Sequence, residues 1–378
     1  MFRNVYVLQH VVFGRTYCGS SVSILGSPEY HFYFKANQML TVDGSFGEGG
    51  GQVLRTSIAL SMITGQSVFI KNIRAARNNP GLQRQHLTAV NAAVEISGAE
   101  VDGNHLGARE LIFRPQKVKP GEYHFSVGTA GSCMLVLQTV LPALMLAESK
   151  STLTLEGGTH NPFAPTYDFL ERCFLGILKR IGPHVEFELL RAGFYPAGGG
   201  LCKVSIIPSQ HPLKSLEIIE RGKLRNQNAV AVVAQLPLSI GEREIDTAGR
   251  ILGWPQNCRS IQSVDSPGPG NVLLLHTEFE NVSEVVTGFG KLNVPAEFVA
   301  KKAAREMKAY LASDAPVGTF LADQLLVPLA IGGGGAFRCT ETSSHTLTNI
   351  HTIKSFLEKE IRSEPQPDGT VLITIPDA

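Results

Sequence analysis

Apolar residues along this chain recur with two spacings, one typical of helices and one typical of short strands, and the regular pattern begins near Thr41. A glycine-rich segment, Asp43 to Gly51, leads directly into an apolar run with a helical period, Val53 to Ile63. The rest of this first unit is predicted to contain a strand at Ser67 to Ile73, a helix at Gly81 to Ser97, and strands near Glu100 and at Glu110 to Arg114.

The same order of elements returns twice. The second unit is predicted to contain a strand at Tyr123 to Val127, a glycine loop at Gly128 to Gly131, helices at Ser132 to Ala147 and Thr166 to Ile181, and strands at Ser151 to Glu156, Val185 to Leu190 and Leu201 to Ile207. The third is predicted to contain helices at Leu321 to Ala330 and Thr346 to Ile361 and strands at Ala336 to Glu341 and Thr370 to Ile375. Repeated units of this kind bury their apolar faces against one another.

The segment between the second and third units does not follow the repeat. It is predicted to contain strands at Ala229 to Gln235 and Val272 to His276, and helices at Ile240 to Leu252 and Ala296 to Leu311. We interpret this segment as a small inserted α/β domain. Its Asp-Ser-Pro-Gly-Pro-Gly tract, Asp265 to Gly270, is predicted to be a turn or flexible loop.

The predicted fold class is therefore α/β. Residues 41–218 and 315–378 are expected to form one large domain of three repeated α/β modules, each a sheet plus two helices, and residues 219–314 a smaller α/β insert domain. Residues 1–40 lack a basic region followed by a clean apolar core, so they make a poor secretory signal. We expect them to be a poorly ordered extension.

Composition narrows the functional classes. The 378 residues are 43% hydrophobic and 18% charged, enough to bury a sizeable core. A formal net charge of +1 argues against a broad basic surface that coats nucleic acid, although a small site that recognises an end is compatible with it. Six widely spaced cysteines without a C-x-x-C pattern favour a reducing, cytoplasmic compartment. The longest apolar run, Cys133 to Ala147, is too short to span a bilayer.

The glycine-rich segment is the first candidate for chemistry. Its glycines surround one carboxylate, Glu48, and precede a helix N-terminus, where free N–H groups and the helix dipole favour phosphate. A carboxylate there would repel phosphate unless a cation lies between them, so Glu48 is a candidate ligand of Mg²⁺ or Mn²⁺. The alternative is a surface turn in which Glu48 interacts favourably with the positive end of the dipole.

A second candidate is an arginine-rich connection between the predicted strand and helix of the first unit. It carries Arg74, Arg77 and Arg84 around a Pro-Gly interruption, and Arg55 lies one turn into the preceding helix. Guanidinium groups suit bidentate phosphate contacts, and strand-to-helix loops collect ligands in α/β folds. The alternative is a solvated loop. The glycine-rich turn from Ala192 to Gly200 is explained equally well by conformation alone.

Several motifs, in this order, resemble the RNA 3′-terminal phosphate cyclase family, over nearly everything after Met39. They are Asp43-Gly-x-x-Gly-Glu-Gly-Gly-Gly-Gln-x-x-Arg55, Arg74-x-x-Arg77, Pro80-Gly-Leu-x-Arg-Gln85-His, Gly131-Ser-Cys, Gly157-Gly-Thr, Gly-Phe-Tyr-Pro-x-Gly-Gly-Gly200, Ala322-Asp-Gln324 and Ser344-His345-Thr-Leu-Thr-Asn. The family's architecture, three repeated α/β modules plus a smaller insert, agrees with the repeat predicted above.

The resemblance implies a reaction and its residues. ATP adenylates a histidine, AMP passes to an RNA 3′-phosphate, and the neighbouring 2′-hydroxyl attacks to form a 2′,3′-cyclic phosphate. His345 is implied as the nucleophile, a role for which neutral imidazole is chemically suited. By motif match the metal, Mg or Mn, belongs to Glu48. Phosphate contacts and the nucleotide pocket map onto Arg55, Arg74, Arg77 and Gln85, and onto Gln138, Pro165, Phe320, Leu321, Ala322, Asp323 and Gln324.

Two departures from the family pattern stand out. Bacterial members typically have tyrosine where this chain has Phe320, so stacking on adenine is retained without a hydroxyl hydrogen bond. Histidine often precedes the Gly-Phe-Tyr-Pro motif, where this chain has Ala192.

Two other functions fit part of the pattern. Catalytically silent relatives that act in ribosome assembly lack the histidine, so His345 favours the enzyme. Enolpyruvyl transferases also repeat α/β modules and bind anions, but they need no covalent histidine–AMP. The expected partners are ATP and RNA with a 3′-terminal phosphate, and the physiological RNA and the oligomeric state stay open.

Overall fold

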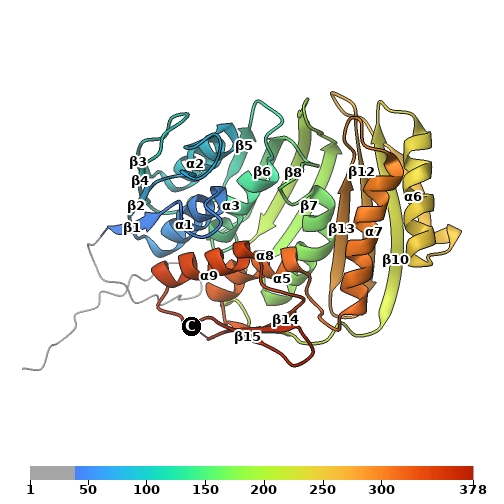
Figure 1. The fold of residues 1–378 in the computed structure, drawn as a ribbon. Helices are drawn as coiled ribbons and strands as arrows, with labels where there is room; N and C mark the ends of the chain where they lie inside the picture. Colours follow the sequence, from blue (N-terminus) through green and yellow to red (C-terminus); the bar gives the residue numbers. More distant parts are fainter. Residues whose placement is uncertain (1–38, 378) are drawn as a thin grey trace, which may run out of the picture.

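The computed structural model describes residues 39–377, which fold into four four-stranded sheets with helices packed against them (Figure 1). The predicted α/β class is confirmed. The prediction for residues 1–40 lies almost wholly outside the described residues. It is wrong at its end, because Leu40 begins strand β1 (Leu40–Asp43), which pairs in parallel with β2 (Val68–Lys71). None of the helices in residues 39–377 has the length and apolar character needed to cross a membrane.

The first sheet has the order β1-β2-β4-β3, with β3 at Glu100–Asp102 and β4 at Leu111–Arg114. Helix α1 (Gly51–Thr64) is buried along nearly its whole length, between α2 (Arg84–Ser97) and helices of the next two units. Helix α2 begins three residues later than predicted. Gly81 has a left-handed φ of 78°, which a helix cannot contain, and Gln83 is the N-cap residue.

The second sheet has the order β5-β6-β8-β7 and lies at the centre of Figure 1. Its strands are β5 (Glu122–Ser126), β6 (Ser151–Gly157), β7 (His184–Arg191) and β8 (Gly200–Ile207). Its helices are α3 (Met134–Leu144), α4 (Tyr167–Phe169), the π-helical turn η1 (Leu170–Phe174) and α5 (Leu175–Ile181). The long helix predicted here is therefore one helical stretch with a π-helical turn in its middle.

The third sheet combines strands that are distant in the sequence. Its order is β15-β16-β14-β9, with β9 at Leu216–Ile218, β14 at Gly335–Cys339, β15 at Arg362–Pro365 and β16 at Val371–Ile375. Helices α8 (Thr319–Ala330) and α9 (Ser344–Phe356) accompany it. The prediction that the last helix extends to Ile361 is wrong, because Leu357 already has an extended backbone and β15 follows. Strands β9 and β15 were not predicted.

The fourth sheet has the order β11-β10-β12-β13 and stands on the other side of the molecule from α1 and α2 (Figure 1). Its elements are β10 (Leu224–Ala234), α6 (Leu238–Leu252), the 3-10 turn η2 (Gln256–Cys258), β11 (Arg259–Ser263), β12 (Gly270–Phe279), β13 (Ser283–Phe289) and α7 (Ala296–Ala312).

Alternate residues of the fourth sheet belong to two hydrophobic cores. Ala229 and Ala231 of β10 pack with α6 and α7, whereas Val230 and Val232 belong to the large core of the remaining sheets. Both faces of the sheet are therefore buried. The threefold repeat and the domain boundaries at residues 219 and 314 stay predictions.

A buried carboxylate connects this sheet to α8. Glu284 on β13 is 3% exposed, and its Oε2 accepts a hydrogen bond of 3.0 Å from the N–H of Gly318, the N-cap residue of α8. Burial raises the pKa of Glu284 to about 8, although the backbone N–H groups of Gly318 and Val285 lower it. A carboxyl group of the fourth sheet thus accepts a hydrogen bond from the start of α8, the helix that carries Phe320 to Gln324.

The variant Glu284→Gln keeps an acceptor for Gly318 but cannot ionise. Because the pKa of Glu284 is raised from 4.5 to about 8 in the folded protein, the wild type takes up a proton on folding within that window. Its free energy of unfolding therefore falls as pH rises towards about 8. We expect this fall to be smaller in Glu284→Gln, measured by denaturant unfolding at a series of pH values.

The exposed Glu358→Gln, two residues beyond the end of α9, is the matched control and should follow the wild type. Equal pH dependence in the wild type and Glu284→Gln would contradict the shifted pKa.

Candidate active site

The glycine-rich loop before α1 holds Glu48 in a fixed position. Gly47 and Gly49 have left-handed φ values of 60° and 62°, which glycine adopts without a steric penalty. The N–H of Glu48 donates to Thr348 Oγ1 at 3.0 Å, and Glu48 Oε2 accepts from the N–H of Gly50 at 2.8 Å. The loop is therefore hydrogen-bonded to α9, 300 residues away in the sequence.

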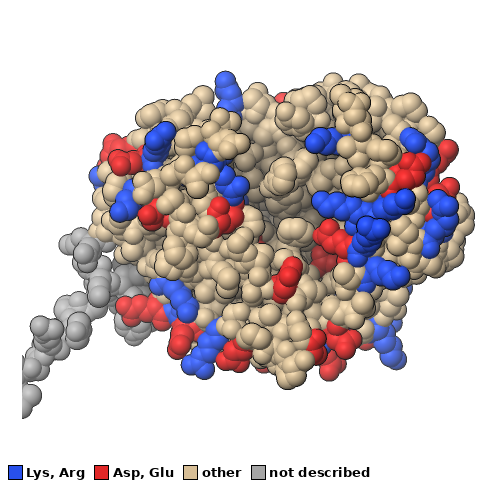
Figure 2. All heavy atoms as spheres, in the orientation of Figure 1, with Lys and Arg blue, Asp and Glu red and all other residues tan. Residues whose placement is uncertain are grey.

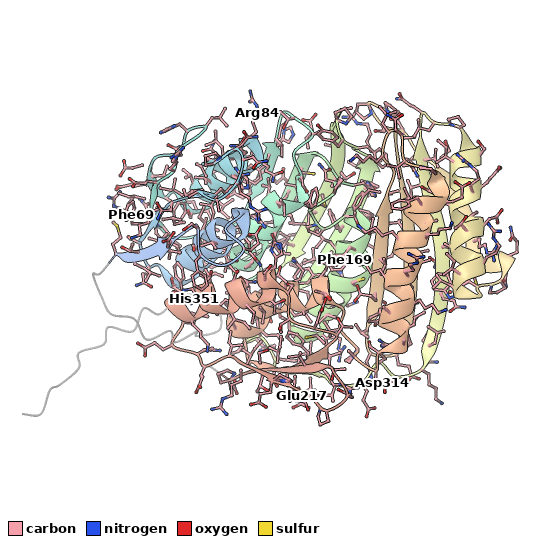
Figure 3. All side chains as sticks on the ribbon, viewed as in Figure 1. Phe69, Arg84, Phe169, Glu217, Asp314 and His351 are labelled. Carbon is pink, nitrogen blue, oxygen red and sulfur yellow. The ribbon has the colours of Figure 1, made fainter. Side chains whose placement is uncertain are left out.

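An aromatic contact fastens the same loop a second time. The ring of Phe46 stacks on His351, with centroids 3.8 Å apart. His351 lies on α9, where Figure 3 labels it beneath α1. Loop and helix are thus joined at Phe46 and at Glu48.

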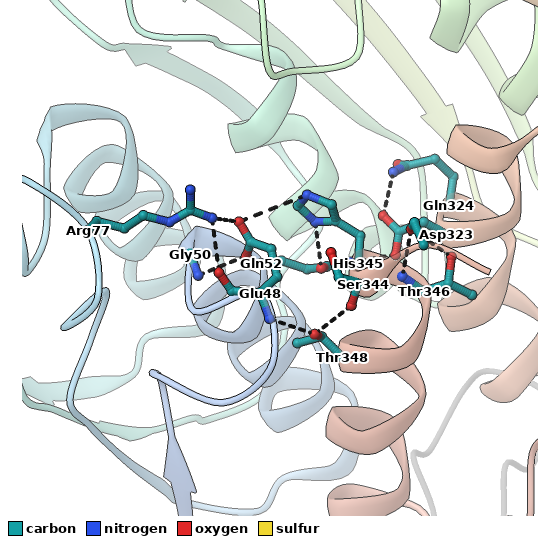
Figure 4. A network of polar contacts seen from close by, with 11 residues as sticks. Glu48, Gly50, Gln52, Arg77, Asp323, Gln324, Ser344, His345, Thr346 and Thr348 are labelled. Atoms are coloured by element: carbon teal, nitrogen blue, oxygen red, sulfur yellow. Dashed lines mark hydrogen bonds and ion pairs between the residues drawn. The ribbon is translucent and has the colours of Figure 1, made fainter.

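His345 occupies the first turn of α9, directly opposite this loop (Figure 4). Ser343 caps the helix, because its Oγ accepts from the N–H of Thr346 at 3.1 Å. His345 Nδ1 lies 3.0 Å from Gln52 Oε1, and His345 Nε2 lies 3.9 Å from Glu48 Oε1. The histidine side chain is 48% exposed, so its Nε2 edge can meet a ligand.

The orientation of Gln52 determines which nitrogen of His345 carries the proton. Gln52 Nε2 donates to Asp323 Oδ1, so the amide oxygen of Gln52 must face His345. An oxygen can only accept, and Nδ1 therefore carries the hydrogen. The lone pair of the neutral ring is then on Nε2, on the side of Glu48.

Asp323 is the centre of this network. It is 9% exposed and accepts from three side-chain amides: Gln52, Asn349 Nδ2 at 3.1 Å and Gln324 Nε2 at 3.2 Å. Burial raises its pKa, whereas His345 and the amide of Gln52 lower it. The carboxylate thereby joins α1, α8 and α9 at one point (Figure 4).

A second chain of hydrogen bonds brings Arg55 to the same place. Arg55 Nε donates to Gln138 Oε1 at 2.8 Å, and Gln138 Nε2 donates to Gln324 Oε1 at 2.7 Å. Burial lowers the pKa of Arg55 to about 10, partly opposed by Asp323, so the group is still cationic at neutral pH. Beside these residues lies a cavity whose lining also includes the apolar side chains of Leu137, Leu141, Leu170, Phe174 and Val327.

The surroundings of His345 keep the ring neutral. Burial lowers its pKa, Arg55 and Arg77 lower it further, and only Asp323 raises it. An imidazole with a lowered pKa keeps its lone pair at neutral pH, as a nucleophile requires.

The other predicted phosphate contacts divide into two groups. Arg77 forms an ion pair with Glu48 Oε1 and also donates to the backbone oxygen of Glu48 at 3.0 Å, so it belongs to the site. The guanidinium of Arg74 donates to Asn79 O at 2.5 Å and Gly81 O at 2.9 Å, within its own loop. Gln85 Oε1 accepts from the N–H of Ser132 at 3.0 Å. These last two residues are therefore engaged outside the Asp323 network.

The residues predicted for the nucleotide pocket differ in exposure. Phe320 is 63% exposed at the start of α8, and Pro165 is half-buried in the loop that precedes α4. Leu321 and Ala322 are completely buried, so their side chains belong to the core. Of the predicted run Phe320 to Gln324, only Phe320, Asp323 and Gln324 retain atoms that a ligand could contact.

The sequence interpretation missed three residues of the network. Gln52, Thr348 and Asn349 each make a hydrogen bond that places a predicted residue, and all three belong to the motifs quoted above. Their helical spacing was a usable signal. Gln52 and Arg55 are three residues apart on α1, and His345 and Asn349 are four apart on α9, so each pair shares a helix face.

The donor set at Glu48 fits a metal that is shared with a phosphate. Within residues 39–377, no three His, Cys, Asp or Glu side chains are grouped so that they could hold a metal ion by themselves. Mg²⁺ is commonly held by one or two carboxylates, with water and substrate phosphates completing its coordination. Glu48, whose two oxygens contact Arg77 and the N–H of Gly50, would supply one ligand of such a shared site and not a complete site for a resident ion.

The variant Asp323→Asn should lower the pKa of His345 further. Asp323 raises that pKa through its negative charge, and asparagine has no charge. An NMR titration of the histidine ring signals measures the change. The surface variant Asp102→Asn, which loses only an exposed ion pair with Arg114, is the matched control. An unchanged or higher pKa in Asp323→Asn would contradict the proposed coupling.

Comparison with known proteins agrees with this geometry. The family model for RNA 3′-terminal phosphate cyclase matches residues 46–363. The chain is 51% identical over 324 residues to the RNA 3′-terminal phosphate cyclase of Koribacter versatilis (strain Ellin345), covering 85% of this chain and 91% of that protein. It is 47% identical over 323 residues to the protein of the same name from Ectopseudomonas mendocina (strain ymp), covering 85% and 94%.

Proposed function

Because the chain belongs to the RNA 3′-terminal phosphate cyclase family, we propose that it uses ATP to convert an RNA 3′-terminal phosphate to a 2′,3′-cyclic phosphate through a covalent adenylate on His345. The observation that carries the histidine assignment is its hydrogen bonding. Gln52 holds Nδ1 and leaves Nε2 as the nucleophilic atom beside Glu48. The enzyme is accordingly a ligase-type nucleotidyl transferase that acts in RNA processing.

In the first step, His345 Nε2 attacks the α-phosphorus of ATP. A phosphorus–nitrogen bond forms, the bond to the bridging oxygen breaks, and pyrophosphate leaves. The ring becomes positively charged as the bond forms, and the hydrogen bond from Nδ1 to Gln52 then strengthens. Asp323, which accepts from the other end of the same amide, stabilises that charge through Gln52.

In the second step, an oxygen of the RNA 3′-phosphate attacks the phosphorus of the adenylate. The phosphorus–nitrogen bond breaks, and Nε2 regains its lone pair. In the third step, the RNA 2′-hydroxyl attacks the 3′-phosphorus, its proton is lost, and AMP leaves as the cyclic phosphate forms. Each step develops negative charge on phosphoryl oxygens, which nearby cations stabilise.

The cations of the site fit this requirement. Arg55 and Arg77 both lower the pKa of His345, which supports the proposal that they act on a phosphate bound at Nε2. A divalent ion bound at Glu48 would neutralise charge on the triphosphate. Arg74 and Gln85, on the adjacent loop and helix start, are proposed to contact the RNA phosphate, and Phe320 and Pro165 to contact adenine.

The two alternative functions are less well supported. A scaffold protein has no need of a buried relay that holds one nitrogen of a histidine, and this chain retains the histidine and the complete relay. An enolpyruvyl transferase is disfavoured by the family match. The cytoplasmic location predicted from the cysteine pattern remains part of this proposal, and the five cysteines in the described part of the chain are free thiols.

The variant His345→Ala should lose the protein–AMP adduct entirely while it keeps the fold, because alanine has no lone pair with which to attack phosphorus. Transfer of label from α-labelled ATP to the protein measures the adduct, and circular dichroism checks the fold. The exposed His211→Ala should label like the wild type. A wild-type yield of adduct from His345→Ala would refute the assignment.

The variant Glu48→Ala should reduce adenylation by roughly tenfold or more at limiting Mg²⁺, because the triphosphate loses its shared cation. Raising Mg²⁺ or Mn²⁺ should restore part of the rate, and initial rates of adduct formation across a metal titration measure both effects.

Glu110→Ala, an exposed carboxylate on the first sheet's outer loop, is the control. If Glu48→Ala kept the wild-type rate at limiting metal, the metal role would be contradicted and Glu48 would have only a structural role in the loop.

A further inference from the structure

Two exposed aromatic side chains have no role in the chemistry described so far. Phe163 is fully exposed, and Tyr195 is 72% exposed. Phe163 also has a left-handed φ of 64°, which is rare and unfavourable for a bulky residue. An aromatic ring held in water against the hydrophobic effect, and in Phe163 also against backbone preference, indicates a ligand-binding role.

The loop that carries Phe163 is held rigidly. On one side of it, His160 Nε2 contacts Asp168 Oδ2 at 2.9 Å, and both residues are buried. Asn161 Nδ2 donates to the backbone oxygen of Ala130. On the other side, Thr166 Oγ1 accepts from the N–H of Phe169 at 3.2 Å. Phe163 therefore projects from a loop whose two ends are fixed.

The turn that carries Tyr195 is held by His160 and Ala130, which also hold the loop of Phe163. The rings of His160 and Phe194 stack with centroids 5.3 Å apart, and the two residues form a β-bridge. At Gly198 a Cβ would lie 2.7 Å from the Cα of Ala130, so the turn packs backbone to backbone on that residue. Both aromatic residues thus project from loops that meet at Ala130.

Ala130 also connects these loops to the predicted phosphate contacts. It precedes Gly131 and Ser132, and the N–H of Ser132 donates to Gln85 at 3.0 Å. The neighbouring His86 is buried against Gly51 at the start of α1, and burial, followed by Arg55 and Arg74, lowers its pKa. The aromatic loops therefore border the side of the site where Gln85 lies.

Charge alone gives little affinity for RNA on this protein. The net charge is +1, and on the face that Figure 2 shows, Lys and Arg side chains are interspersed with Asp and Glu around a central hollow. Proteins that bind single strands obtain affinity from bases stacked on aromatic rings, independently of sequence. Two exposed rings on rigid loops beside a phosphate site match that mode of binding.

We propose that Phe163 and Tyr195 form a stacking platform for the nucleobases that adjoin the 3′-terminal phosphate of single-stranded RNA. This inference rests on the proposed function, because that function supplies the RNA end. The terminal phosphate fixes the position of the strand, and the platform binds the bases without distinguishing their sequence.

The test compares Phe163→Ala and Tyr195→Ala with the wild type. The probe is a short, fluorescent, 3′-phosphorylated oligoribonucleotide, together with versions in which one base at a time near the 3′ end is removed. We expect the wild type to bind the complete probe about tenfold more tightly than the probe that lacks a stacked base. In the matching alanine variant that difference should disappear, and adduct formation from ATP alone should stay at the wild-type level.

Two further variants distinguish stacking from structural effects. Tyr195→Phe keeps the ring and should bind like the wild type. Phe298→Ala removes a ring that is 63% exposed on α7, and it should leave every comparison unchanged. If an alanine variant lost affinity by the same factor for the complete and the base-lacking probes, the proposal would be overturned. It would also be overturned if the alanine variants bound every probe as tightly as the wild type does.

The proposed function is tested separately by cyclic-phosphate formation on the same complete probe. If the wild type forms no cyclic phosphate but shows the base-dependent affinity, then the function fails while the stacking platform stands. If the wild type cyclises the probe and the alanine variants keep the base-dependent difference, then the platform fails while the function stands.

Discussion

The hydrogen bond between Gln52 and Asp323 determines which atom of His345 is free to react. Asp323 is buried and can only accept while ionised, so the amide nitrogen of Gln52 turns towards it and the amide oxygen turns towards the histidine. Without this bond, the two ends of the amide would be nearly equivalent and the histidine could present either nitrogen. Asp323, which touches no reacting atom, thereby selects Nε2 as the nucleophilic nitrogen of His345.

The same carboxylate also holds the site together mechanically. Its partners come from α1, α8 and α9, and Gln52 and Asp323 are 271 residues apart in the sequence. A buried carboxylate that lost one donor would carry the desolvation penalty of an unpaired charge. The three helices are therefore coupled through one buried group.

The parts of the fold with strong local patterns could be predicted from the sequence. The helix α1 follows from an apolar period over a long run, and β6 and β8 follow from alternation along strands of seven and eight residues. Strand β9 has only three residues, and β13 contains Glu284 and Gly288, whose types oppose a strand, so neither gave a sufficient signal. Glu284 is tolerated there because it pairs with Gly318, a tertiary contact that no local pattern contains.

The residues of the site show the same division. Glu48 stood out because glycines surround it, whereas His345 could be singled out from eleven histidines only by resemblance to a family. Gln52 and Asn349 were passed over because their partner, Asp323, is remote in the sequence.

The contact between Glu284 and Gly318 makes the start of α8 depend on the fourth sheet. Deleting the fourth sheet would remove the acceptor of the Gly318 N–H and uncover the part of the large core that Val230, Val232 and Val285 complete, so a shortened chain would expose both to water. The segment therefore supports the start of α8 in addition to forming its own core.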